Sequence, residues 1–120
     1  MDTLRLVILG ATGSIGTQAL DVVRMHADRI EVVALAAGRR VDEAVAFARE
    51  FGCKHLAFGD EGVRDATALA QLGDDVCVGF GATAVAALTQ LDDVDVVLNA
   101  LSGEAGMRAS YDTLKAGRTL

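Results

Sequence analysis

The stretch LRLVILGATGSIG, residues 4–16, decides the fold of this chain. It joins the mostly apolar segment Leu4–Leu9 to three glycines with the spacing G-x-x-G-x-x-G, and a segment of helical period follows. Between a strand and a helix, Gly10 permits a tight turn, Gly13 lets the backbone approach a diphosphate, and Gly16 allows close packing of helix on strand. Free amides at the helix N-terminus would face the anion. The stretch therefore predicts a dinucleotide site.

The glycine spacing separates this site from other phosphate-binding turns. It differs by one residue from the commonest dinucleotide-binding spacing, G-x-G-x-x-G. No Gly-Lys followed by Ser or Thr occurs after it, so a nucleoside-triphosphate P-loop is excluded. A glycine-rich turn without a ligand is the plain alternative. It is the weaker interpretation because a strand precedes the turn and a helix follows it.

Length and composition indicate one globular domain. The chain has 120 residues, 52% of them hydrophobic, with 13 glycines and no proline or tryptophan, which excludes a disordered or collagen-like chain. The longest apolar run, Val32–Ala37, is too short to span a membrane, and the first residues lack the features of a signal peptide. We therefore expect a soluble, cytoplasmic protein. The net charge of −6 argues against nucleic-acid binding.

Apolar runs alternate with segments of helical period along the whole chain. The predicted strands are Leu4–Leu9, Ile30–Ala36, His55–Phe58, Val76–Val78 and Val94–Asn99. The predicted helices are Gly13–His26, Val41–Phe51, Glu61–Leu72, Ala82–Gln90 and Glu104–Ala116, and three of them end at Gly52, Gly73 and Gly117. Continuously apolar strands joined through helices indicate a buried parallel sheet. We predict an α/β, doubly wound, mostly parallel sheet of the Rossmann type in three αβα layers.

Apolar stripes predict which helix faces pack on the sheet. In the first helix the stripe consists of Ile15, Ala19, Val22 and Val23. In the last helix it consists of Met107, Tyr111 and Leu114, so we expect Tyr111 to be a packed core residue. The chain stops at Thr119 and Leu120, where a sixth strand would start, and this predicts a fragment of a longer protein.

The end of the second predicted strand indicates which dinucleotide is bound. A fold that prefers NAD usually carries Asp or Glu there, which binds the ribose 2′-hydroxyl. This chain has Ala36-Ala37-Gly38-Arg39-Arg40 instead. Two guanidinium groups suit a 2′-phosphate through charge-assisted bonds, so NADP is favoured over NAD. The alternative, solvated loop charges, is weaker because both arginines follow a strand at the carboxyl edge of the sheet.

Two further patterns lie in the last third of the chain. Tyr111 and Lys115 have the Tyr-x-x-x-Lys spacing of short-chain dehydrogenases, with Ser102 upstream. The pattern recurs by chance and follows the glycine motif more closely than in that family, so a core position for Tyr111 is favoured. Asn99 ends the fifth predicted strand at the edge where ligands bind. A cleft-lining role and a hydrogen-bonded turn role are equally supported for it.

No other side chain is assigned a catalytic or metal-binding role. We expect Cys53 and Cys77 to be small buried hydrophobic residues. We expect a helix-end or surface position for His26 and the start of an edge strand for His55. No Cys/His spacing suits zinc. Solvated loop charges are expected for Asp92, Asp93 and Asp95.

Five blocks of the sequence carry a likeness to a known family. They are Ile8–Gly16, Leu20–Arg24, Val32–Arg39, Ala100–Met107 and Lys115–Leu120. Together they resemble the N-terminal, NADPH-binding domain of the 1-deoxy-D-xylulose 5-phosphate reductoisomerases. The likeness covers nearly all of the chain, and the first and third blocks in combination are the most specific.

The resemblance implies a set of cofactor-binding residues. The diphosphate and ribose of NADPH would be held by Thr12, Gly13, Ser14 and Ile15, and the 2′-phosphate would be surrounded by Gly38, Arg39 and Arg40. Gly10 and Gly16 complete the predicted site. Two positions depart from the family pattern. The family commonly has Lys or Arg followed by Asn at Arg39 and Arg40, and a small residue at Glu104, whose carboxylate would have to point away from the nicotinamide.

The resemblance also implies a reaction for the whole enzyme. The family rearranges 1-deoxy-D-xylulose 5-phosphate and reduces the resulting aldehyde to 2-C-methyl-D-erythritol 4-phosphate, in non-mevalonate isoprenoid biosynthesis. It uses NADPH and Mg²⁺ or Mn²⁺. Residues 1–120 would then be the NADPH-binding domain, inactive alone, while a catalytic domain beyond them binds the metal and the sugar phosphate. Homodimerisation stays open.

Two alternative functions stay open beside this one. The first is a short-chain-type NADP reductase that uses Tyr111 and Lys115. The second is a non-catalytic module that senses NADP. Reading the gene beyond Leu120 would separate the second alternative from a cofactor domain.

Overall fold

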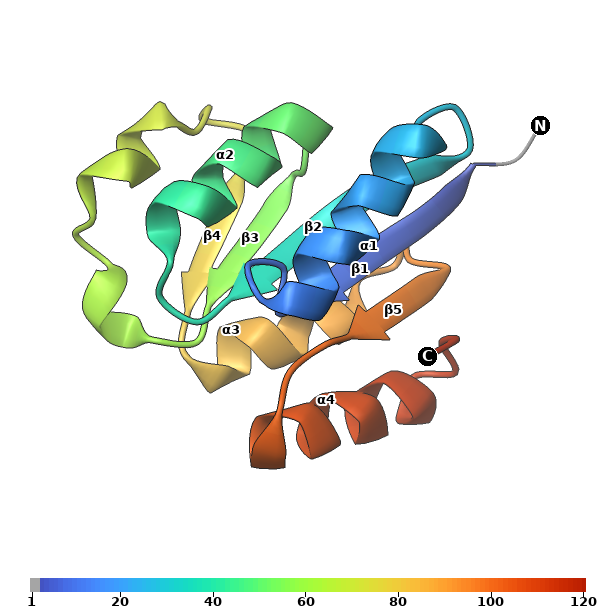
Figure 1. Ribbon diagram of the computed structural model, residues 1–120. Helices are drawn as coiled ribbons and strands as arrows, with labels where there is room; N and C mark the ends of the chain where they lie inside the picture. The colour runs from blue at the N-terminus through green and yellow to red at the C-terminus, as the bar shows by residue number, and fades with distance from the viewer. Residues whose placement is uncertain (1–2) are drawn as a thin grey trace.

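The computed structural model describes residues 3–120 and contains one parallel sheet between two layers of helices (Figure 1). The strands are β1 (Leu4–Leu9), β2 (Ile30–Ala37), β3 (His55–Phe58), β4 (Cys77–Phe80) and β5 (Val96–Asn99). They lie side by side in the order β4-β3-β2-β1-β5, and each neighbouring pair is parallel. The predicted fold is confirmed, and each of the five predicted strands is found within two residues of its expected bounds.

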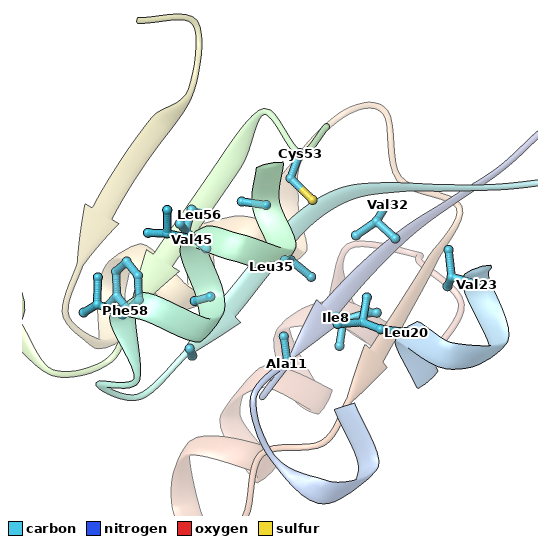
Figure 2. Packing of buried hydrophobic residues seen from close by; sticks show 14 of the residues in the cluster. Ile8, Ala11, Leu20, Val23, Val32, Leu35, Val45, Cys53, Leu56 and Phe58 are labelled. Atoms are coloured by element: carbon cyan, nitrogen blue, oxygen red, sulfur yellow. The ribbon is translucent and has the colours of Figure 1, made fainter. Parts of the chain in front are cut away.

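The helices cover both faces of the sheet. They are α1 (Ser14–Met25), α2 (Val41–Phe51), α3 (Ala82–Ala87) and α4 (Gly103–Lys115). Leu6 and Ile8 of β1 belong to the core on the side of α1 and α2, which Figure 2 shows, while Val7 and Leu9 belong to the core beneath α3 and α4. This alternation follows from the two-residue period of a strand. No helix within residues 3–120 has the length and hydropathy of a membrane span.

The strand order places a crevice beside β1. The chain runs from β1 outward through β2 and β3 to β4, and then returns through α3 to place β5 on the other side of β1. Connections therefore leave the carboxyl ends of β1 and β5 toward opposite faces of the sheet, and ligands of open α/β sheets bind at such a point. Leu9 is in register with Ala36 of β2 and with Asn99 of β5, so the ends of all three strands meet there.

Two of the predicted helices have a different form. The expected helix Glu61–Leu72 is two short 3₁₀-helices, Glu61–Val63 and Thr67–Gln71, because the Asp60 side chain accepts a hydrogen bond from the Gly62 amide and starts a local turn. The helix expected over Ala82–Gln90 ends at Ala87 and continues as one 3₁₀ turn.

The glycines at the predicted helix ends behave differently from one another. Gly52 and Gly117 take the left-handed conformation, with φ of +67° and +78°, as a helix end favours. Gly73 does not, because the segment before it is a 3₁₀-helix that ends at Gln71, and Leu72 after it is already extended.

The predicted packing face of α4 is wrong. Met107, Tyr111 and Leu114 are 77%, 60% and 60% exposed, and the buried face consists instead of Gly106, Ala109 and Thr113. Small side chains let this helix approach the sheet closely, so the apolar stripe is turned outward and Tyr111 is not a core residue.

The stripe of α1 is wrong in part for a related reason. Ile15 and Val22 are exposed, whereas Gly16, Leu20 and Val23 are buried against the sheet. At Gly16 α1 packs directly on the backbone of Gly10 and Ala11, and a stripe counted from large apolar side chains does not include this glycine.

The outer side of β5 is paired at one point. Thr119 forms a parallel bridge with Val96, and the Val97 amide donates to the Thr119 carbonyl oxygen at 2.9 Å. This pairing agrees with the predicted start of a further strand at the end of the sequence.

Candidate functional site

The turn that follows β1 is held rigidly against β2. The amides of Gly10 and Ala11 both donate to the carbonyl oxygen of Ala36, each at 2.9 Å. Gly10 has φ of +83°, a conformation that side chains rarely adopt, and a Cβ there would lie 3.0 Å from the Ala100 carbonyl oxygen. Glycine is therefore required at this position for both its conformation and the close approach of the next turn.

The third glycine of the motif brings α1 against the turn. A Cβ on Gly16 would overlap the Gly10 carbonyl oxygen and would lie 2.7 Å and 2.8 Å from the Cα and carbonyl carbon of Ala11. Gly13 differs, because its backbone is extended and its only near atom, the Gly10 carbonyl oxygen, is 3.6 Å from a Cβ position. The predicted packing role fits Gly16, and the open space at Gly13 fits the approach of a ligand.

The N-terminus of α1 has the properties of an anion site. The first amides of any helix lack an intrahelical acceptor, and here no side chain caps them. No acidic residue lies in the first turn. The Thr17 hydroxyl donates to the carbonyl oxygens of Gly13 and Ser14, at 2.9 Å and 3.0 Å, and so leaves the amides untouched. Ser14 and Ile15 are exposed and Thr12 is half-buried around this end of the helix.

Arg39 and Arg40 lie in the turn between β2 and α2. They line an open cavity of about 660 Å³ together with the start of α2 and the first 3₁₀ segment. Arg40 Nη1 lies 3.7 Å from Glu43 Oε1, whereas Arg39 forms no ion pair with any carboxylate of residues 3–120. Gly38 is exposed and a Cβ on it would contact nothing. The cavity therefore offers one free guanidinium and one that is shared.

The two predicted parts of the site lie at the same edge of the sheet. Ala36 accepts the hydrogen bonds of the glycine turn, and Gly38 and Arg39 follow it within three residues. The structure thus brings together the nine predicted cofactor-binding residues, Gly10, Thr12, Gly13, Ser14, Ile15, Gly16, Gly38, Arg39 and Arg40, at the carboxyl ends of β1 and β2.

Asn99 lies at the end of β5, on the other side of β1. Its Nδ2 donates to the Gly106 carbonyl oxygen at 2.7 Å and to Ser110 Oγ at 2.8 Å, and its Oδ1 accepts from the Leu101 amide at 3.1 Å. It also lines a second cavity, of about 460 Å³, with Leu101, Gly103, Gly106, Met107 and Ser110. The hydrogen-bonded role is confirmed, and Asn99 also lines a cavity, while lining of the cofactor cleft stays a prediction.

The pair Tyr111 and Lys115 does not have the arrangement of a proton-transfer pair. Lys115 Nζ lies over the face of the Tyr111 ring, 5.8 Å from its centroid. Neither residue lines the cavity at Asn99. Tyr111 is exposed, so burial of its ring does not argue against the short-chain dehydrogenase interpretation. The geometry of Tyr111 and Lys115 nevertheless gives that interpretation no support.

The two cysteines differ in environment. Cys53 is buried as predicted, and this burial, with a contribution from the Glu31 carboxylate, raises the pKa of its thiol to about 12. Cys77 is exposed, which contradicts the prediction, because it begins the edge strand β4. Neither thiol lines the cavities described above.

Two other polar residues also differ from expectation. Asp95 is not a solvated loop charge, because its Oδ2 accepts from the Arg5 amide at 2.8 Å and from Arg5 Nε at 3.2 Å. These bonds hold the pKa of its carboxyl below the ordinary value. His55 begins β3, which lies between β2 and β4 and is therefore not an edge strand. His26 is exposed at the end of α1, as expected.

The prediction from sequence did not include the partners of Asn99. Gly106 packs on the turn as Gly16 does, since a Cβ there would overlap the Leu101 carbonyl oxygen. The G-x-x-G spacing of Gly103 and Gly106 directly after a predicted strand was the available signal. Ser110 carries no such signal, because its position relative to Asn99 depends on the path of α4.

A parallel sheet with this glycine turn at its crevice is the fold of Rossmann-type dinucleotide-binding domains. The family model described as 1-deoxy-D-xylulose 5-phosphate reductoisomerase matches residues 6–120. The chain belongs to the 1-deoxy-D-xylulose 5-phosphate reductoisomerase family.

Curated relatives carry the same description. The reductoisomerase of Mycobacterium marinum is 42% identical over 118 residues, which are 98% of this chain and 28% of the relative. That of Cupriavidus metallidurans is 41% identical over 116 residues, 95% of this chain and 30% of the relative. The chain therefore spans less than a third of the length of these relatives.

Solved structures agree in fold. The reductoisomerase from Zymomonas mobilis in complex with NADPH has a TM-score of 0.89 and 29% identity, over 98% of this chain and 31% of that one. A DOX-P reductoisomerase in complex with NADPH, fosmidomycin and magnesium has a TM-score of 0.87 and 30% identity, over 96% of this chain and 28% of that one.

Proposed function

We propose that residues 1–120 are the NADPH-binding domain of a 1-deoxy-D-xylulose 5-phosphate reductoisomerase. The observation that carries the proposal is the N-terminus of α1 at Gly13, which has no side-chain cap and no acidic residue in its first turn. It lies beside a turn that presents Arg39, which forms no ion pair within residues 3–120. One feature suits a diphosphate and the other a 2′-phosphate. Two solved relatives are described as NADPH complexes, which supports this choice of cofactor.

Each predicted residue has a definite part in this proposal. The amides at the start of α1 would donate to the diphosphate, and the hydroxyls of Thr12 and Ser14, which flank this helix end, would add to them. The exposed apolar side chain of Ile15 would cover the ribose. Arg39 would grip the 2′-phosphate, and Arg40 would contribute less, because Glu43 already neutralises part of its charge.

The proposal for the whole protein extends beyond these residues. Bound NADPH supplies hydride, and this domain binds and orients the cofactor. We propose that the full-length protein converts 1-deoxy-D-xylulose 5-phosphate to 2-C-methyl-D-erythritol 4-phosphate in isoprenoid biosynthesis. Within residues 3–120 no three His, Cys, Asp or Glu side chains are grouped to hold a metal ion. We therefore propose that Mg²⁺ or Mn²⁺ and the sugar phosphate bind elsewhere in the protein, and that this segment alone has no turnover.

Calorimetric titration with NADPH and NADH tests the cofactor assignment. We expect the chain to prefer NADPH, and Arg39→Ala to weaken NADPH binding by about tenfold or more while leaving NADH binding unchanged, because a charge-assisted contact is lost. Arg40→Ala should cost NADPH less than Arg39→Ala does. Arg49→Ala is a matched control, since this exposed arginine of α2 contacts Gln71 and lies outside the cavity.

Two results would contradict the assignment. Equal affinities of the unmodified chain for NADPH and NADH would show that it does not recognise the 2′-phosphate. An unchanged preference for NADPH in Arg39→Ala would show that Arg39 does not bind this phosphate. Turnover of the sugar phosphate by the full-length protein separates an enzyme from a non-catalytic NADP-sensing module, which would bind NADPH without consuming it.

A further inference from the structure

The Asn99 side chain forms three hydrogen bonds within the protein. Both hydrogens of Nδ2 are donated, to the carbonyl oxygen of Gly106 and to Ser110 Oγ, while Oδ1 accepts from the Leu101 amide. A carbonyl acceptor on one side and an amide donor on the other fix the orientation of the amide group. The side chain therefore joins the end of β5, the turn after it and the first two turns of α4.

The segment held by Asn99 forms one wall beside the glycine turn. Ala100 donates its amide to the Leu9 carbonyl oxygen at 2.9 Å, and its own carbonyl oxygen lies 3.0 Å from the position of a Cβ on Gly10. No side chain separates these two backbones. A shift of the β5–α4 turn would therefore be transmitted to the turn that follows β1.

The proposed path of the cofactor across the sheet brings its nicotinamide half beside the β5–α4 turn. In the proposed function the 2′-phosphate of the adenosine lies at Arg39, after β2, and the diphosphate lies at the start of α1, after β1. A dinucleotide extends across the crevice of such a sheet, so the nicotinamide half continues past β1 toward β5. The Asn99 cavity, between Leu101, Gly106 and Ser110, lies on that side.

We infer that Asn99 is a positioning residue for the nicotinamide half of the cofactor, an inference that rests on the proposed NADPH binding. It acts through the β5–α4 turn, which it holds in the bound shape before the ligand arrives. A turn that already has the bound shape does not have to be ordered when the ligand binds, which lowers the free-energy cost of binding. Both polar atoms of Asn99 already form hydrogen bonds within the protein, and we therefore assign it to holding this turn in place.

Comparison of two ligands separates this role from a general effect on folding. NADPH occupies both halves of the site, whereas 2′,5′-ADP occupies only the adenosine half at Arg39. Calorimetric titration of Asn99→Ala should show NADPH binding weakened about tenfold and 2′,5′-ADP binding changed less than about twofold. Ser110→Ala removes one of the three bonds and should show the same split with a smaller loss, about threefold, which keeps the test valid if Asn99→Ala does not fold.

Gln90→Ala is the matched control. Gln90 is also a side-chain amide that donates to a backbone carbonyl of α4, that of Asp112 at 3.0 Å, but at the far end of the helix from the crevice. Its loss should leave the affinities for both ligands unchanged. A parallel loss for NADPH and 2′,5′-ADP in Asn99→Ala and Ser110→Ala, or no loss for either ligand, would overturn the inference.

Hydrogen exchange of the free protein distinguishes a failed inference from a failed function. In Asn99→Ala the Leu101 amide loses its acceptor and should exchange about tenfold faster. Unchanged exchange there overturns the inference even where NADPH binds as proposed. If the unmodified chain binds neither ligand, the proposed function fails and the inference fails with it, whatever the exchange rate.

Discussion

Two turns of this molecule have nearly the same sequence pattern and different properties. After Leu9 the chain reads GATGSIG, residues 10–16, and after Asn99 it reads ALSGEAG, residues 100–106. Each turn leaves the carboxyl end of a parallel strand, and β1 and β5 are neighbours with Leu9 in register with Asn99. In each, the last glycine is buried where its helix meets the preceding turn.

The backbone and the charge of the two turns differ. Left-handed φ occurs at Gly10 in the first turn and at Gly103 in the second, so the chain bends at different places. The first helical turn of α1 has no acidic residue, while that of α4 carries Glu104. In both turns the last glycine packs its helix on the preceding turn, while only the N-terminus of α1 lacks an acidic residue, which is the property expected of the proposed anion site.

The largest expected effect is that of Gly16→Ala. The new methyl group would meet the backbone of Gly10 and Ala11, which two hydrogen bonds to Ala36 hold in place. We expect a loss of about 3 kcal/mol in the free energy of unfolding, measured by urea denaturation. Gly38→Ala, where a Cβ would contact nothing, is the control and should stay within about 0.5 kcal/mol. A stable Gly16→Ala variant would contradict the packing role.

Gly106→Ala tests whether the second turn is equally rigid. A Cβ would overlap the Leu101 carbonyl oxygen, but the next nearest atoms, the Leu101 carbonyl carbon and Cβ, are 3.0 Å and 3.7 Å away, so fewer backbone atoms have to shift than at Gly16. We expect a smaller loss, about 2 kcal/mol in the same measurement. An effect larger than that of Gly16→Ala would reverse the order of rigidity proposed for the two turns.

Ser14→Glu gives the first turn the acidic residue that the second one has. The carboxylate should stabilise α1 by about 0.5 kcal/mol through the helix dipole and should weaken NADPH binding about fivefold by repulsion of the diphosphate. Stability and affinity thus change in opposite directions, which urea denaturation and calorimetry measure separately. Ser14→Gln is the neutral control. Unchanged NADPH affinity in Ser14→Glu would place the diphosphate away from this helix end.

Glu104→Gln is the reverse exchange and has the smallest expected effect. Loss of the charge should cost about 0.5 kcal/mol of stability, because the carboxylate no longer faces the N-terminus of α4. NADPH affinity should change by less than about twofold. An increase of tenfold in affinity would show that the α4 N-terminus also faces a phosphate group of the ligand.

Prediction from sequence succeeded where one local property decides the structure. The strands are short, mostly apolar runs between segments of helical period, which is the local signal of a buried parallel strand, and β1 and β3 were predicted to the residue. It failed for α4, because Tyr111 and Leu114 form a good apolar stripe while the helix packs through Gly106 and Ala109. Closeness of approach, and not hydrophobicity, selects that face.

The candidate site also has one part that the sequence predicted and another part that it did not. Glycine spacing and the two arginines after β2 are short-range patterns that predicted the dinucleotide turn and the preference for NADP. The family resemblance added Thr12, Ser14, Ile15 and Gly38 to the predicted site, which the titrations above test. The hydrogen bonds of Asn99 and the contact between Ala100 and Gly10 were beyond such patterns, because 90 positions separate the last two residues along the chain.

Local sequence thus dictated the order of strands and helices, the glycine turn and the class of ligand, since each depends on neighbouring residues and their intrinsic conformations. Tertiary packing alone decided that Leu9 and Asn99 end side by side and that the two similar turns form one crevice. It also decided that the apolar stripe of α4 faces outward. The physical reason is that these outcomes depend on which backbones approach closely in space, and residues far apart in sequence make that approach.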